Sequence, residues 1–147
     1  RYGYVIECKG ADKDVEGNIV AVHADYFPDS RSGTEGANTY KVKGNIHWVS
    51  AAHALAAEVR LYDRLFTDPQ PDSGGKEFLE FLNPDSRRAI TAWLEPGVAQ
   101  GPNAVQPEDR VQFERHGYFV ADRVDSHPGF PVFNRIVTLK DAWQTTK

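Results

Sequence analysis

Apolar and polar positions alternate along much of the chain, and this alternation predicts short strands more often than helices. Residues 2–8 alternate, and a β-rich segment at residues 19–26 follows a polar stretch at 12–18. A period of two with β-branched and aromatic residues is typical of strands. The start of the chain is therefore predicted to form a β-hairpin, in which Cys8 is expected to be a small buried hydrophobic residue. A loop of turn-forming residues is predicted at 28–38.

A second alternating segment at residues 41–50 predicts another strand. Its apolar face would carry Val42, Ile46 and Trp48, with Gly44 between them. Its polar face would carry Lys41, Lys43, Asn45 and His47. Successive side chains of a strand point to opposite faces, so one face should pack on a core and the other should meet water or an anion.

The pattern at residues 51–66 fits two structures. Leu55, Val59, Tyr62 and Phe66 follow helical spacing, and the alanines before them favour a helix. The same stretch from residue 58 onward also fits a strand with alternate charged positions. The local pattern favours a helix at 51–57 and leaves 58–66 undecided.

The remainder reads as short elements separated by turns. The predicted order is a loop at 67–75, a short helix at 76–82, a strand at 88–94 and a pattern-poor stretch at 96–109. A strand pair or one bent strand follows at 110–122, broken at His116-Gly117, and then a turn at 125–131 and a last strand at 132–139. Many short strands and few helices predict an all-β barrel or sandwich.

Composition agrees with a folded domain. The chain has 147 residues, of which 40% are hydrophobic and 26% charged, and its net charge is −4. These fractions exclude a disordered or collagen-like chain. One cysteine cannot form an internal disulfide, which favours a reducing compartment. The chain contains no methionine and opens directly on a predicted strand, so we expect a piece of a longer protein.

Charge is unevenly distributed along the sequence. Residues 40–66 carry four basic and two acidic groups, and residues 110–147 carry six basic and four acidic groups, so both segments are net +2. The segments 1–39 and 67–109 are net −3 and −5. A polyanion would therefore be attracted to two stretches of the chain rather than to its whole surface.

Motifs that would indicate an independent enzyme are missing from the sequence. No glycine-rich phosphate loop, nucleophile elbow or cysteine cluster is present, and no membrane-spanning apolar run occurs. His47, His53 and Asp63 lack the spacing of a metal site. We therefore predict no catalytic residue, no metal and no cofactor within this segment.

Several ordered segments together resemble the C-terminal half of the glutaminyl-tRNA synthetases, a family of class I aminoacyl-tRNA synthetases. They are RYGYVIECKG at the start, KVKGNIHWVSA, HWVSAAHALAAEVRLYDRLF, FLNPDS, VQFERHGYFVADR and PVFNRIVTLKDAW. The resemblance implies antiparallel β-barrels of the ribosomal-protein-like anticodon-binding type. Residues 1–57 would then be the remainder of the distal barrel and residues 58–147 would complete the proximal barrel, with a strand at 58–66.

The resemblance also implies which side chains meet RNA. Arg1 matches a family arginine that reads the first anticodon base, a pyrimidine. Gln112 and Arg115 match family residues at the pocket for the central uracil. A regular strand would point Gln112 and Arg115 to opposite faces, so we expect the strand to bulge or end there. Independently of the resemblance, the face with Lys41 and Lys43 would suit phosphates.

The family implies further partners for the longer protein. A catalytic domain in the same chain would use ATP and Mg²⁺ to attach glutamine to tRNA(Gln), and this segment alone should be inactive. We expect a cytoplasmic monomer. The alternatives are the equivalent region of an archaeal or eukaryotic-type glutamyl-tRNA synthetase, a protein-interaction barrel that binds no RNA, or a small independent enzyme, which the missing motifs oppose.

Overall fold

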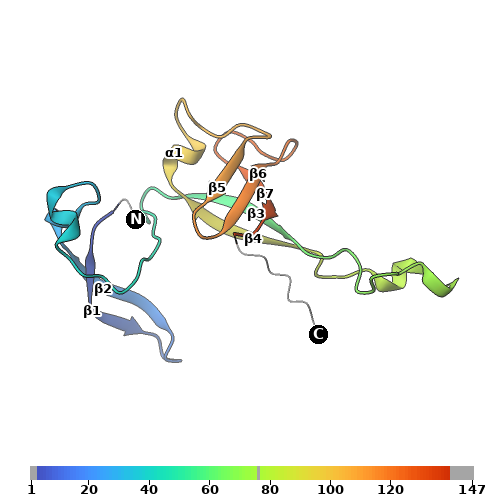
Figure 1. Cartoon of the computed structure of the whole chain (residues 1–147), viewed down its shortest axis with the longest axis horizontal. Coiled ribbons are helices and arrows are strands. Elements are labelled where there is room, and N and C mark those ends of the chain that lie inside the picture. Colours follow the sequence, from blue (N-terminus) through green and yellow to red (C-terminus); the bar gives the residue numbers. More distant parts are fainter. Residues whose placement is uncertain (1–2, 76, 140–147) are drawn as a thin grey trace. The chain divides into compact units, whose positions relative to one another are not determined.

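The computed structural model describes residues 3–75 and 77–139. The chain divides into two compact units, residues 1–48 and 49–147, which are treated separately below. Figure 1 shows the order of the elements along the chain. Arg1 and the first residue of the predicted helix at 76–82 lie outside the described residues. The division into distal and proximal barrels stays a prediction.

The first unit contains the predicted hairpin. Strands β1 (Ile6–Lys13) and β2 (Ile19–Tyr26) pair antiparallel. Asp14 shapes the connecting turn, because its Oδ1 atom accepts hydrogen bonds from the backbone N–H groups of Glu16 at 2.9 Å and Asn18 at 2.8 Å. The hairpin is confirmed. Its first strand begins and ends later than the alternation predicted. The last residues of β1 were predicted to lie in the turn, but they pair with β2.

The loop after the hairpin folds into two short helical segments. It contains the 3-10 helices η1 (Pro28–Ser30) and η2 (Glu35–Asn38). Ser30 is buried, with only 3% of its surface exposed, and its side chain connects this loop to the hairpin through hydrogen bonds. Its Oγ atom accepts a hydrogen bond from the N–H of Val5 at 2.7 Å and donates one to the carbonyl of Phe27 at 2.6 Å.

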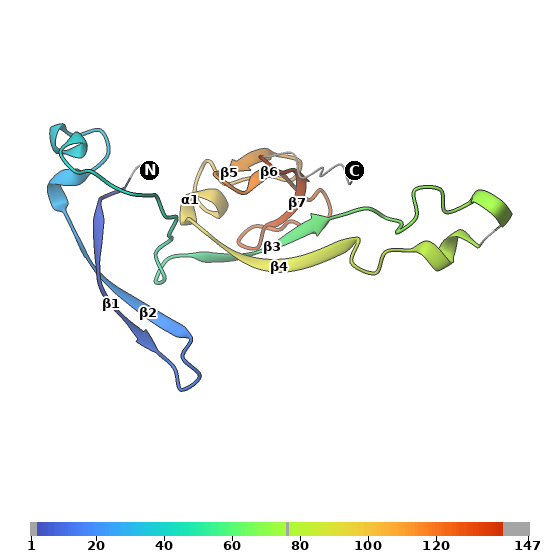
Figure 2. The same ribbon diagram turned by 60° about the horizontal axis from the view of Figure 1, so that its bottom comes forward.

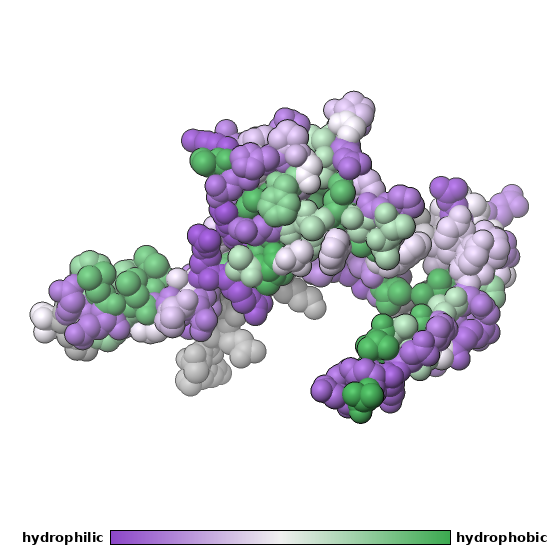
Figure 3. Space-filling view, turned by 180° about the vertical axis from the view of Figure 1, so that it is seen from behind, coloured by the Kyte–Doolittle hydropathy of each residue, from purple (hydrophilic) through white to green (hydrophobic). Residues whose placement is uncertain are grey.

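Both strands of the hairpin are exposed along their whole length. Apolar residues are visible on its surface (Figure 3). The exposed large apolar residues of β2 include Ile19, Val20 and Val22. The expectation that Cys8 would be buried is wrong, since its side chain is exposed. The alternation predicted the strand correctly, but a two-stranded sheet provides no second layer to cover either face.

The second unit is built on a five-stranded sheet in the order β4-β3-β7-β6-β5. Its strands are β3 (Leu55–Tyr62), β4 (Arg87–Leu94), β5 (Arg110–Phe113), β6 (Gly117–Ala121) and β7 (Val132–Val137). The β3–β7 pair is parallel and the other pairs are antiparallel. Helical elements are short: η3 (Ser73–Gly75), η4 (Phe78–Phe81) and α1 (Pro96–Ala99). The all-β prediction with few short helices is confirmed.

The core of this unit lies on one face of the sheet. Its buried members are Ala57, Val59, Leu94, Phe119, Ala121 and Phe133. The Phe113 ring lies 4.8 Å from the ring of Phe119 and 5.0 Å from that of Phe133 (centroid distances). Alternate residues of β3 and β6 supply these side chains, so the period of two seen in the sequence reports the inward face of each strand.

Two local predictions are wrong. Residues 41–50 form no strand, and Val42, Ile46 and Trp48 are 56%, 60% and 64% exposed. The helix favoured at 51–57 is instead a turn followed by β3, which pairs with β4 along its whole length. β3 lies between β4 and β7, so hydrogen bonds from both sides outweigh the helix propensity of its alanines. The strand that the resemblance implied at 58–66 is confirmed for residues 58–62.

The end of β3 and the start of β4 continue as a paired arm, described for residues 63–75 and 77–86 (Figure 2). The N–H of Asp63 donates to the carbonyl of Ser86, and the N–H of Asn83 donates to that of Leu65, both at 2.8 Å. The Phe66 and Phe78 rings meet edge to face at 6.3 Å. The arm is therefore held by its own hydrogen bonds and apolar contacts.

Candidate nucleic-acid interface

The β5–β6 hairpin carries both residues that the resemblance placed at a nucleobase pocket. Gln112 lies in β5, and Arg115 lies in the turn that joins β5 to β6. In the strand register Gln112 is opposite Tyr118, and Phe113 is opposite Gly117. The predicted break at His116-Gly117 is confirmed, since β6 begins at Gly117.

The packing of the hairpin decides which side chains face outward. Phe113 and Phe119 pack into the core, so the alternate residues Gln112 and Tyr118 lie on the opposite face of the sheet. Gln112 is exposed, and Tyr118 is 44% exposed. An exposed amide beside an exposed aromatic ring is a combination that suits an unstacked base.

Arg115 has an unusual backbone conformation. Its φ is +69°, and the N–H of His116 donates to the carbonyl of Phe113 at 2.9 Å across the turn. A positive φ at this position of a turn normally selects glycine or asparagine. The ladder ends at Phe113, so Arg115 is released from strand alternation, which removes the objection that it must point away from Gln112.

A glycine is required directly after this turn. Gly117 has φ +139°, and a Cβ at this position would collide with the carbonyl oxygen of Val137 in β7. The backbone of β6 therefore approaches β7 more closely here than any other residue type would allow. This close approach fixes the position of the hairpin end that carries Arg115.

A cluster of charged groups connects β3, the residue that follows β6 and the loop before β7. The Arg60 guanidinium on β3 lies 2.6 Å from Glu58 Oε1, 2.6 Å from Asp125 Oδ2 and 3.2 Å from Asp122 Oδ2. The hydrogen bonds that Arg60 donates to the carboxylates of Glu58 and Asp125 raise the pKa of Arg60 above its ordinary value. Only 13% of the Arg60 side chain is exposed, so its charge is engaged within the fold and is not available to RNA.

Asp122 is the acceptor that organises this cluster. Its carboxylate accepts hydrogen bonds from the N–H groups of Asp125 and Val124 at 2.9 Å and from Nδ2 of Asn134 at 2.7 Å. The bond from the Asp125 N–H, followed by those from Asn134 and Val124, lowers the pKa of Asp122 to about 2. These contacts tie the end of β6 to β7 and, through Arg60, to β3.

The other predicted site residues are placed separately. Lys41 and Lys43 belong to the first unit and are exposed. Arg1 lies outside the described residues. The structure thus brings Gln112 and Arg115 onto one hairpin, while the roles of all five residues in binding stay predictions.

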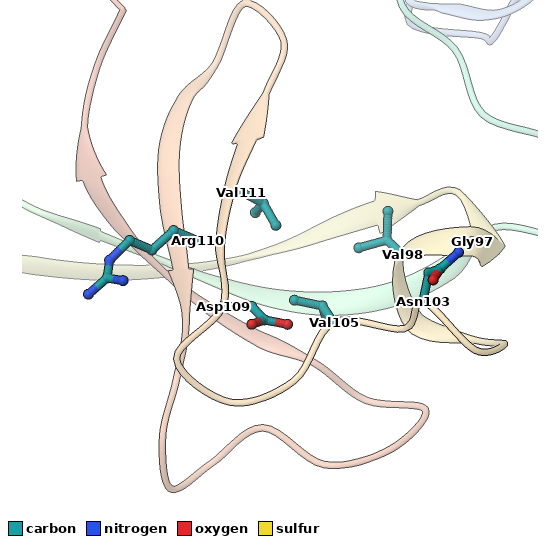
Figure 4. Close-up of a pocket in the computed structure, with 7 residues that line it drawn as sticks. All are labelled: Gly97, Val98, Asn103, Val105, Asp109, Arg110 and Val111. Carbon is teal, nitrogen blue, oxygen red and sulfur yellow. The ribbon is translucent and has the colours of Figure 1, made fainter.

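A shallow hollow of about 330 Å³ lies beside β5 (Figure 4). Its lining residues are Gly97, Val98, Asn103, Val105, Asp109, Arg110 and Val111. Arg110 extends its guanidinium away from the other lining side chains. The Asp109 carboxylate already accepts a hydrogen bond from the Gln106 N–H at 2.7 Å, and three of the seven lining residues are valines, so we assign the hollow no ligand.

Sequence reasoning missed Tyr118 and the strain at Arg115. Tyr118 could have been found from the short turn, because a hairpin with three loop residues places residues 112 and 118 opposite each other. The positive φ of Arg115 could not be predicted from the sequence, because arginine is not a residue type that favours this conformation. Among the residues that the structure describes, no group of three potential metal ligands is found. No helix in these described segments has the length and apolar character needed to cross a membrane.

Comparison with known proteins shows the family to which this chain belongs. Residues 45–122 match the family described as "tRNA synthetases class I (E and Q), anti-codon binding domain". The chain is 72% identical over 143 residues to a glutamine–tRNA ligase of Ralstonia nicotianae and 71% identical to one of Cupriavidus taiwanensis. A third, from Bordetella avium, is 60% identical. Each alignment covers 97% of this chain and 24% of the relative, so the chain spans about a quarter of their length. The family match includes the β5–β6 hairpin. On the basis of this match, the chain belongs to the anticodon-binding domains of the class I tRNA synthetases.

Proposed function

We propose that this chain is the anticodon-recognition part of a glutamine–tRNA ligase. The observation that carries the proposal is the family match, which includes the β5–β6 hairpin on which Gln112 is exposed. The relatives that share 60–72% of its residues are all named glutamine–tRNA ligases, which favours this enzyme over a glutamyl-tRNA synthetase.

The proposed chemistry is the reading of a uracil edge. Uracil presents one N–H donor between two carbonyl acceptors, and the Gln112 amide can both accept and donate hydrogen bonds. The Arg115 guanidinium can donate a charge-assisted bond to a carbonyl or phosphate oxygen. Proteins read the bases of single-stranded loops by splaying them out of the stack and forming hydrogen bonds with these edges. Together the two side chains would distinguish uracil from cytosine, whose edge has a donor where uracil has an acceptor.

Other parts of the chain would complete the surface. Arg1 would read the first anticodon base, and Lys41 and Lys43 would contact phosphates. Residues 1–57 would belong to a distal barrel and residues 58–147 to a proximal one. In the whole cytoplasmic enzyme, acting as a monomer, a separate catalytic domain would bind ATP with Mg²⁺ and attach glutamine to tRNA(Gln).

The test is binding of the chain to anticodon stem-loops of tRNA(Gln). We expect the loop with the natural central uracil to bind more tightly than loops with cytosine, adenine or guanine there. A bidentate base contact is worth roughly 1–3 kcal/mol of discrimination, so a preference of about fivefold or more is expected. Gln112→Ala should reduce this preference while preserving the fold, because the side chain is exposed.

Gln100→Ala is the matched control, since Gln100 is also an exposed glutamine but lies just after α1. It should leave the uracil preference unchanged. Equal binding of the wild-type chain to all four loops would contradict the proposal and favour a protein-interaction module instead.

A further inference from the structure

We propose that Tyr118 is the stacking surface for the nucleobase whose edge Gln112 reads. This inference rests on the proposed function, and it adds a residue to which neither the sequence analysis nor the comparisons gave a role. Four observations on the second unit lead to it.

The first observation is the register of the β5–β6 hairpin. Tyr118 is the direct cross-strand partner of Gln112. Directly opposed residues in an antiparallel pair have Cβ atoms roughly 4.5–5.5 Å apart and share one face of the sheet. A base that bonds to the amide of Gln112 is therefore within reach of the Tyr118 ring.

The second observation is the exposure of the tyrosine ring. Phe113 and Phe119, which lie next to Gln112 and Tyr118 in sequence, are packed together with ring centroids 4.8 Å apart. Tyr118 instead lies on the outward face with 44% of its surface exposed. The core therefore takes the phenylalanines of this hairpin and leaves the tyrosine outside.

The third observation is the neighbour of Tyr118 on its other side. In the ladder with β7, Tyr118 is opposite Val137, which is 52% exposed. A row across three strands thus presents an amide, an aromatic ring and an aliphatic side chain. Such a row offers an apolar surface for the plane of a base and a polar group at one margin for its edge.

The fourth observation is the fixed geometry around the ring. Tyr118 follows Gly117, whose backbone is held against the carbonyl of Val137, and a bulge interrupts the ladder between Tyr118 and Phe119. Bulges re-aim side chains and often lie beside functional sites. The backbone from which the ring projects is therefore held in place, which lowers the cost of ordering this part of the surface against a base.

The experiment compares four proteins and two RNAs. The proteins are the wild-type chain, Tyr118→Ala, Tyr118→Phe and Trp93→Ala, the last as a control because Trp93 is 62% exposed on β4 of the same sheet. The RNAs are the anticodon stem-loop with central uracil and the same loop with an abasic site at that position. Circular dichroism and a urea titration confirm that each variant is folded.

We expect Tyr118→Ala to weaken binding of the uracil loop about fivefold or more, because base–aromatic stacking is worth roughly 1–3 kcal/mol per base. Tyr118→Phe keeps the ring and should bind within about twofold of the wild type. The abasic loop should bind Tyr118→Ala and the wild type equally, since it has no base to stack. Trp93→Ala should bind both RNAs like the wild type.

Two results would overturn the inference, and they are distinguishable. If the wild type prefers the uracil loop to the abasic loop and Tyr118→Ala keeps that preference, the stacking role is wrong and the proposed function stands. If the wild type binds both loops equally, base reading itself fails and the inference fails with it.

Discussion

The guanidinium of Arg60 on β3 and the carboxylate of Asp122 at the end of β6 lie 3.2 Å apart (Nη1 to Oδ2), although 62 residues separate them in the sequence. Asp125 and Asn134 complete the contact, from the loop before β7 and from β7 itself. Tyr62 adds a hydrogen bond to Asn134 Oδ1 at 2.7 Å. These polar groups connect β3, which leads into the arm, with β7 and the end of the β5–β6 hairpin.

Asp122→Asn should lower the free energy of unfolding in a pH-dependent way. The pKa of Asp122 is about 2 in the fold, against an ordinary value of 3.8. A lowered carboxyl pKa stabilises the fold above the ordinary value, and this stabilisation is lost as the pH falls through the folded value. At 1.36 kcal/mol per pKa unit, the contribution is about 2 kcal/mol at pH 6. Urea unfolding at pH 6, 4, 3 and 2.5 should show the wild type and Asp122→Asn converging as the pH falls below 4.

Asp63→Asn is the matched control for this experiment. The Asp63 carboxylate is 68% exposed and lies 4.0 Å from Nε of Arg64, and exposed ion pairs contribute little. The hydrogen bond that its Oδ1 atom accepts from the Arg64 N–H at 2.7 Å can also be accepted by the amide oxygen of asparagine. It should change the free energy of unfolding by less than about 0.5 kcal/mol across the same pH series. A difference between the wild type and Asp122→Asn that stays constant from pH 6 to pH 2.5 would contradict the assigned pKa.

Arg115→Asn should stabilise the fold while weakening RNA binding. A left-handed conformation costs an ordinary side chain about 1–2 kcal/mol, and asparagine tolerates it better. Arg115 has φ +69°, so we expect its replacement to raise the free energy of unfolding by up to about 1 kcal/mol. Loss of the guanidinium should reduce affinity for the uracil loop. Thermal unfolding and stem-loop binding measure the two effects.

Glu108→Asn separates these two effects, because Glu108 has almost the same φ, +70°, at a different turn. Its side chain pairs with exposed Arg123, an interaction of small energetic value. A similar gain in stability with unchanged RNA affinity is expected. If both variants bind RNA equally well, Arg115 has no role in recognition.

Gly117→Ala should destabilise the second unit and disturb the hairpin end. A side chain at this position meets the carbonyl of Val137 in a conformation that only glycine adopts readily. Strained positions of this kind cost on the order of 1–3 kcal/mol each. Gly97→Ala is the control, since a Cβ at Gly97 meets no atom within 4 Å. Urea unfolding should show a clear loss for Gly117→Ala and none for Gly97→Ala.

The sequence predicted elements that are marked by alternation or by turn residues, and it failed where the pairing partners of a segment decide its structure. The hairpin at the start, the strand at 88–94 and the break at His116-Gly117 follow from alternation and turn residues. The strand Leu55–Tyr62 could not be predicted in this way, because its alanines favour a helix. It is a strand because β4 and β7 form hydrogen bonds with it from both sides. Residues 41–50 alternate as a strand would, yet they form no ladder. Gln112 and Arg115 came from the resemblance, whereas Tyr118 needed the register.

Lys41 and Lys43 are predicted to contribute through charge rather than through base identity. Each phosphate contact on single-stranded RNA adds about 0.7 to the slope of log K against log salt concentration. The double variant Lys41→Ala/Lys43→Ala should therefore flatten this slope by roughly 0.7 to 1.4, and it should weaken all four central-base loops equally. Lys9→Ala/Lys13→Ala removes the same charge from β1, where Lys9 already pairs with Glu7 at 2.6 Å. Binding titrations between low and moderate salt measure both slopes. Equal slopes for the two double variants would show that Lys41 and Lys43 make no phosphate contacts of their own and affect binding only through the net charge of the chain.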